Sequence, residues 1–105
     1  MPLWDAVNEE HLCDRWVCWE IGFEPPYPRA TRRVVHSLSP MSAAEAAEQA
    51  AREATEEEMR REGWDPDDVG YMDGARHYIE VETPGGPMRF SVGVVIKMKY
   101  EAKPL

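Results

Sequence analysis

The segment 41–62 constrains the fold more than any other part of the chain. It consists mainly of Ala, Glu, Arg, Gln and Met, which are good helix formers, and Gly63 follows it with the freedom to adopt a left-handed conformation. One long helix is therefore predicted here. Its apolar stripe, at helical spacing, consists of Ala44, Ala47, Ala51 and Ala54, with Met41, Thr55 and Met59 on the flanks. Because these residues are small, we expect close approach to the layer beneath, which must supply the large side chains.

Two start signals precede this helix. In Ser39-Pro40 a serine cap is followed by a proline, whose missing N–H has no partner in the first helical turn anyway. Ser42 and Glu45 match a capping box one turn later and provide an alternative start. We expect the helix to open at Ser39-Pro40.

Residues 15–24 alternate between two faces, which predicts a strand with one buried face. Trp16 and Cys18 fall on the opposite, outer face. The face expected in the core carries Val17, Trp19, Ile21 and Phe23. Aromatic residues therefore occur on both faces of this strand.

Three further strands are predicted. Residues 31–38 are rich in β-branched side chains and follow a rigid loop with three prolines in 25–28. Residues 77–83 alternate, 84–87 form a hairpin turn, and 88–101 alternate again as one unusually long strand.

This order predicts a single α+β domain over 1–105, with the arrangement β-β-α-β-β. The expected architecture is one long helix packed on a four-stranded, mostly antiparallel sheet, and a β-grasp-like variant has the same order. The first twenty residues contain no uninterrupted apolar core, and the longest clean apolar run, 94–96, is too short to span a bilayer. We therefore expect a cytoplasmic protein with no membrane contact.

Neither a metal site nor a cofactor is predicted. Cys13 and Cys18 are too far apart on an extended strand for a disulfide, so free thiols are expected. Their opposite parity places them on opposite faces of the strand, which does not favour a shared zinc site. The acidic run that includes Asp67 and Asp68 resembles the opening of a calcium loop. It lacks a ligand at Val69 and the bidentate Glu later in the loop.

No catalytic residue is predicted. The chain has no Gly-rich phosphate loop, no His-Glu-x-x-His helix and no Gly-x-Ser-x-Gly elbow. Its histidines, His11, His36 and His77, lie on three separate segments. The enzyme alternative requires a pocket in which one of them meets a carboxylate or a cysteine.

The acidic charge is concentrated in one block. The chain has a formal net charge of −8, and residues 45–73 contribute eleven acids against three arginines. Such a block is either a solvated helix face or a surface that attracts a basic partner. The candidate partner-binding residues are Glu45, Glu53, Glu56, Glu57, Asp67 and Asp68.

Carboxylates spaced along a helix can imitate backbone phosphates and occupy the basic groove of a nucleic-acid-processing protein. In composition the chain is similar to small acidic phage-encoded inhibitors, including anti-CRISPR proteins. Direct binding of nucleic acid is not expected, because the chain is acidic overall, although Arg89, Lys97 and Lys99 are predicted on the outer face of the sheet.

A homo-oligomeric interaction protein is the alternative. Trp16 and Val95 are predicted to add apolar surface to the outer face of the sheet, where excess apolar surface is typical of an interface. A homodimer that buries this face is compatible with either role.

Overall fold

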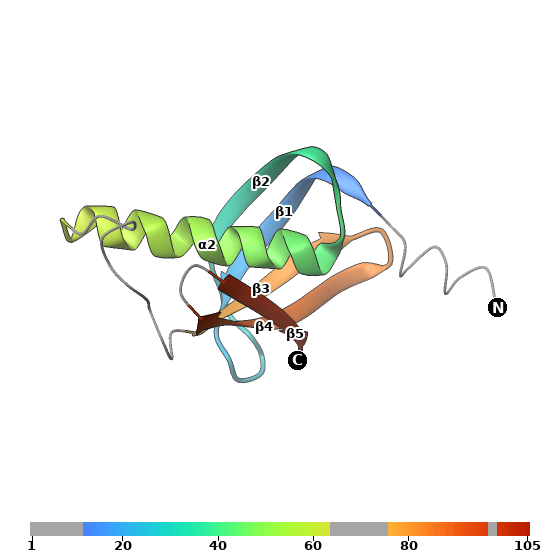
Figure 1. Ribbon diagram of the computed structural model, residues 1–105. Coiled ribbons are helices and arrows are strands. Elements are labelled where there is room, and N and C mark those ends of the chain that lie inside the picture. The colour runs from blue at the N-terminus through green and yellow to red at the C-terminus, as the bar shows by residue number, and fades with distance from the viewer. Residues whose placement is uncertain (1–11, 64–75, 97–98) are drawn as a thin grey trace.

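A five-stranded antiparallel sheet with one helix packed on it is formed by the residues that the computed structural model describes, 12–63, 76–96 and 99–105 (Figure 1). The elements are β1 (Cys13–Ile21), β2 (Arg29–Met41), α2 (Ala43–Arg61), β3 (Arg76–Thr83), β4 (Gly86–Ile96) and β5 (Lys99–Pro104). The strands lie in the order β2-β1-β3-β4-β5, and each neighbouring pair is antiparallel. The predicted α+β class is confirmed, with five strands rather than four.

The additional strand arises because 88–101, predicted as one strand, folds as two. β4 ends at Ile96, β5 begins at Lys99, and these two residues lie opposite each other in the antiparallel pair. Both strands have the same period of two, so the alternation of residue types contains no sign of the reversal.

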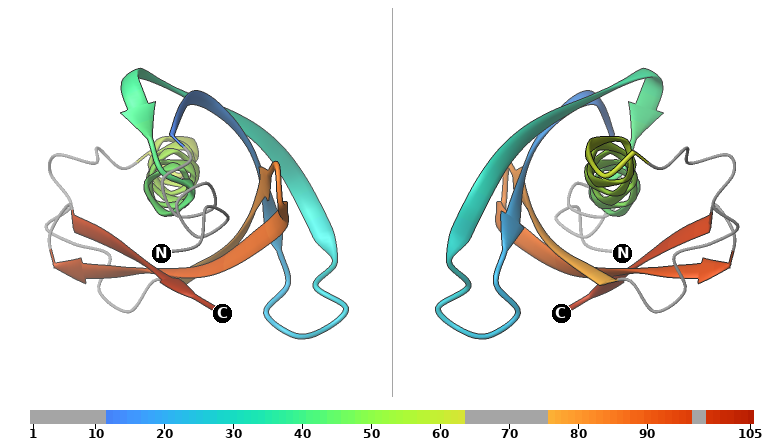
Figure 2. Two further views of the ribbon diagram at one scale, coloured as in Figure 1. Left: turned by 90° about the vertical axis from the view of Figure 1, so that its right-hand side faces the viewer. Right: turned by 90° about the vertical axis from the view of Figure 1, so that its left-hand side faces the viewer.

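The sheet curls around the helix. Figure 2 shows α2 within the concave side, with β2 and β5 at the two margins of the sheet. We call the side toward α2 the inner face and the opposite side the outer face. This curvature places the core between the inner face and one side of α2.

The core combines small residues of the helix with large residues of the sheet. The buried residues of α2 are Ala46, Ala47, Ala50, Ala51, Thr55 and Met59. The inner face contributes Trp16, Cys18, Val35, Ile79, Val81, Phe90 and Val92. The predicted alanine contact is therefore confirmed, but it is rotated toward Ala46 and Ala50, and Ala44 and Ala54 are only half-buried. No helix among the described residues is long and apolar enough to cross a membrane.

The prediction of which face of β1 is buried is wrong. Trp16 and Cys18 lie in the core at 4% and 0% exposure, whereas Val17 and Trp19 are only half-buried and Phe23 is exposed. Both faces of β1 carry apolar side chains, so alternation alone does not select one. The inner position of Trp16 also gives its indole N–H a buried acceptor, the carbonyl oxygen of Met41 at 2.9 Å.

Ile21 is buried at 8% exposure although it has the parity of Val17. It pairs with Arg29 of β2, next to an irregularity of the β1–β2 register between Glu20 and Ile21, and it lies outside the core cluster beneath α2.

The helix begins one turn later than expected. β2 continues through Ser39 and Pro40, and Ser42 is the N-cap of α2. The Ser42 hydroxyl accepts from the Glu45 N–H at 3.2 Å, and the Glu45 carboxylate accepts from the Ser42 N–H at 3.0 Å. The alternative capping box is confirmed, and Pro40 lies in an edge strand, where a missing N–H is tolerated. The end is as predicted, with Gly63 at φ 85°.

Candidate functional site

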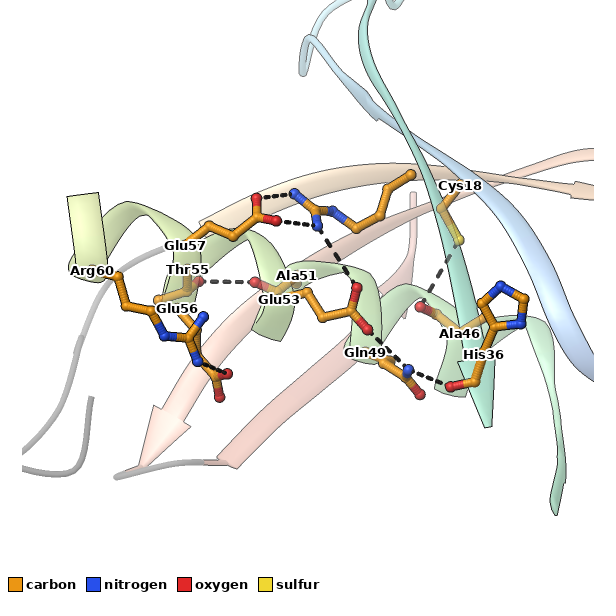
Figure 3. A network of polar contacts seen from close by, with 11 residues as sticks. Cys18, His36, Ala46, Gln49, Ala51, Glu53, Thr55, Glu56, Glu57 and Arg60 are labelled. Carbon is orange, nitrogen blue, oxygen red and sulfur yellow. Dashed lines mark hydrogen bonds and ion pairs between the residues drawn. The ribbon is translucent and has the colours of Figure 1, made fainter. Parts of the chain in front are cut away.

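One flank of α2 is tied to β2 by a network of polar side chains (Figure 3). Arg33 projects from the inner face of β2 and donates to both oxygens of Glu57, at 3.0 and 2.6 Å. Its guanidinium is also 3.7 Å from Glu53, whose other oxygen accepts from Gln49 at 3.0 Å. Gln49 in turn donates to the carbonyl oxygen of His36 at 2.7 Å. We call Gln49, Glu53, Glu57 and Arg33 the α2–β2 network.

Arg33 and Glu57 stabilise each other in their charged forms. The hydrogen bond from Arg33 lowers the pKa of Glu57, and the same bond raises the pKa of Arg33. Both groups therefore stay ionised at neutral pH. The Arg33 side chain is largely covered, at 15% exposure, whereas those of Glu53 and Glu57 remain 37% and 50% exposed.

The other predicted partner-binding residues lie apart from this network. Glu45 is part of the capping box, two helical turns before Glu53. Glu56 pairs with Arg60 at 3.4 Å, as the helical spacing predicts. Asp67 and Asp68, together with the calcium-like run, lie outside the described residues.

The sequence prediction missed Arg33 and Gln49. One signal was available, because Gln49, Glu53 and Glu57 recur every four residues and must share one flank of a helix. The position of Arg33 depends on how β2 lies beside that flank, and this is a tertiary property.

A second polar cluster, also missed, lies on the outer face. The Glu80 side chain is 2% exposed and accepts from the Nε atoms of Arg29 at 2.6 Å and Arg89 at 3.1 Å. Arg29 also lies over the ring of Trp19, 5.0 Å from its centroid, and Arg89 lies 4.9 Å from the ring centroid of Tyr27. These five residues, the Glu80 cluster, bury one carboxylate beneath two arginines.

The predicted oligomer-interface residues have different outcomes. Trp16 lies in the core beneath α2, so it is not available to a second molecule as the outer-face prediction requires. Val95 lies within β4, and its side chain is outside what the structure describes.

The nucleophilic groups in the described residues show no catalytic pairing. Both cysteines are free; burial, with a smaller effect of Glu53, raises the pKa of Cys18 to about 12, so this thiol stays protonated. The Thr55 hydroxyl donates to the carbonyl oxygen of Ala51 at 2.9 Å, so its contact with His77 Nε2, at 2.8 Å, is one in which it accepts. Burial lowers the pKa of His77, and the neutral ring acts as a donor to Thr55 rather than as its base.

A cavity of about 300 Å³ lies between β1 and the β3–β4 turn. Its lining residues are Cys13, Arg15, Trp16, Val17, Glu82, Thr83 and Pro84. The enzyme alternative requires a histidine with a carboxylate or a cysteine in a pocket, and this lining contains no histidine. Among the described residues there is also no group of three or more His, Cys, Asp or Glu placed to hold a metal ion.

We expect the two thiols to differ in reactivity toward an aromatic disulfide reagent at about pH 8. Cys13 is partly exposed and should react in the folded protein, whereas the buried neutral thiol of Cys18 should react only after unfolding. The number of protein thiols that react, counted from the aromatic thiolate released with and without denaturant, measures this difference. Cys13→Ser should leave no fast-reacting thiol, and rapid release of two thiols from the folded wild type would contradict the burial of Cys18.

Comparison with known proteins found no matching family model, no matching curated protein and no matching solved structure.

Proposed function

We propose that this chain is a protein-binding module that occludes a basic surface of a nucleic-acid-handling protein. It acts by binding rather than by catalysis. The proposed contact surface is the acidic side of α2, with Glu45, Glu53, Glu56 and Glu57; Asp67 and Asp68 complete the predicted set. An inhibitor of this kind, like the phage-encoded anti-CRISPR proteins that the composition resembles, would act in the cytoplasm on its target.

The α2–β2 network is the observation that carries this proposal. Arg33 and Gln49 hold Glu53 and Glu57 in defined positions and leave both side chains partly exposed. A carboxylate has more acceptor sites than these bonds use, so each can also accept from a partner's lysine or arginine. Because these carboxylates are already ordered, less side-chain conformational entropy is lost when a partner binds them.

The charge of the helix supports attraction at longer range. Residues 45–62 contain seven glutamates and three arginines, so this side of the molecule retains an acidic excess even with Arg33 beside it. Charge of one sign on one side steers a basic partner and makes its association sensitive to salt.

The test compares two variants that each lose three negative charges. The first is Glu53→Gln/Glu56→Gln/Glu57→Gln, in which the amides keep the size of the side chains and can still accept from Arg33. The second, Asp14→Asn/Glu24→Gln/Glu82→Gln, removes the same charge away from α2. Immobilised wild type and variants are used to capture proteins from nuclease-treated host lysate, with elution at low and then high salt.

We expect the wild type and the second variant to retain one nucleic-acid-binding protein that is eluted by salt. The first variant should bind it at least about tenfold more weakly. Equal weakening in both variants would show that only net charge matters, and unchanged binding by the first would contradict the acidic contact surface. Recovery of the chain alone would favour the homo-oligomeric alternative.

A further inference from the structure

The outer face of the sheet carries a set of arginines that oppose the acidic side of α2. Trp19 lies opposite both Arg32 of β2 and Glu80 of β3, so these three residues share the outer face. Arg15 is on the same face of β1, because it lies four residues before Trp19 in a continuous register. Arg29 and Arg89 contact Glu80, and Arg76 contacts Ser91, so these three arginines lie on the outer face as well. We call the full set the outer arginines: Arg15, Arg29, Arg32, Arg76 and Arg89.

These arginines outnumber the carboxylates available to them. Glu80 is shared by two of them, and Glu82 accepts from the Trp19 indole N–H at 2.7 Å. Arg15 and Arg32 are exposed and have no acidic partner among the described residues. On β5, Glu101 and Lys103 lie opposite Gly93 and Ser91 on this face, and their charges balance. The outer face is therefore locally cationic in a chain whose net charge is negative.

Aromatic rings lie between the outer arginines. The guanidinium of Arg29 covers Trp19, and that of Arg89 covers Tyr27. Phe23, 61% exposed, contacts Tyr78 with ring centroids 5.7 Å apart. The loop between β1 and β2 thus folds its rings against the outer face and joins them to the arginines.

We propose that the outer face binds single-stranded nucleic acid. Arginine matches phosphate geometry with two parallel N–H donors, and in the described part of the chain no carboxylate occupies those of Arg15 and Arg32. Guanidinium planes and aromatic rings also stack on unpaired bases, which are accessible in a single strand but covered in a duplex. A surface that combines free arginines, stacked arginines and an exposed phenylalanine suits this ligand better than a carboxylate-bearing peptide, which gains nothing from stacking.

The net charge of −8, which led us to expect no direct contact with nucleic acid, is an average over opposite surfaces. The sheet lies between its outer face and α2, which packs within its concave side (Figure 2). At physiological ionic strength charges are screened over about 8 Å, which weakens the effect of the α2 carboxylates on this face.

The experiment measures fluorescence anisotropy of a labelled oligothymidylate of about 15 nucleotides, a length that covers the surface of a small binding domain. The full chain is titrated in at about 50 mM and at about 200 mM salt. The test variant is Arg15→Gln/Arg32→Gln, and the matched control is Arg52→Gln/Arg61→Gln on α2. Both variants lose two positive charges, and circular dichroism checks that each is folded.

We expect the test variant to bind the single strand at least about tenfold more weakly than the wild type, with a salt slope lower by about 1.4. The control should bind like the wild type. Absence of saturable binding at the lower salt, or equal loss in both variants, would overturn the proposal. A poly-glutamate peptide bound as tightly as the oligonucleotide would overturn the choice of ligand, as would a DNA duplex bound more tightly than the single strand.

Discussion

Trp16→Ala is expected to lower the free energy of unfolding by about 3–5 kcal/mol, the range for removal of a large buried aromatic side chain. Trp16 lies beneath the N-terminal half of α2 at 4% exposure and donates its indole N–H to the carbonyl oxygens of Met41 and, at 3.1 Å, Cys13. Its loss removes core volume and also leaves the acceptor at Met41 without this donor. Urea unfolding followed by circular dichroism measures the change.

Two further variants separate the contribution of the indole N–H from that of the buried ring volume. Trp16→Phe keeps most of the ring volume and loses the indole N–H, so we expect it to cost about 1–2 kcal/mol. Trp19→Ala, on the outer face of the same strand, should cost less than Trp16→Ala because Trp19 is only half-buried. If Trp16→Ala instead left stability unchanged and altered only the oligomeric state, the burial of Trp16 would be wrong.

Glu80→Ala should lower the free energy of unfolding by about 2–3 kcal/mol. The carboxylate is 2% exposed and is the shared acceptor of Arg29 and Arg89, so its removal leaves two guanidinium groups close together without a counter-charge. These arginines are 46% and 38% exposed and can regain water, which keeps the effect below that of a fully buried ion pair. Thermal and urea unfolding provide the measurement.

Glu82→Ala is the control for loss of a carboxylate on the same strand. Glu82 is exposed and accepts only from Trp19 among the hydrogen bonds described, so about 1 kcal/mol or less is expected. Replacement of Glu80, Arg29 and Arg89 together by leucine should recover much of the loss, because no uncompensated charge remains. Equal effects of Glu80→Ala and Glu82→Ala would contradict the role of Glu80 as a buried counter-ion.

The parts of the fold that sequence predicts are those set by local chemistry. Ser42, Glu45 and Gly63 carry the signals for the two ends of α2, and period-two alternation locates the strands. Alternation does not specify which face of β1 is buried, since both faces are apolar. Alternation also does not reveal where the chain reverses between two strands of equal period, as it does after Ile96.

In the candidate site, too, the local features follow from sequence and the contacts between distant segments do not. The acidic character of α2 follows directly from composition, and the Glu56–Arg60 pair from helical spacing. The partner of Glu57 is 24 residues away in the chain, and that of Glu80 from β2 is 51 residues away. Contacts of this kind require the pairing of β1, β2 and β3, which no local pattern specifies.

The alanine contact of α2 has a consequence for how this protein can change. α2 adds mainly methyl groups to the core, and the sheet provides the bulk, so the large side chains that define the interior are on other elements. Substitutions on the solvent side of α2 therefore alter its charge pattern without repacking the interior. If this side of the helix binds a partner, as proposed, its residues can change one at a time while the core stays the same.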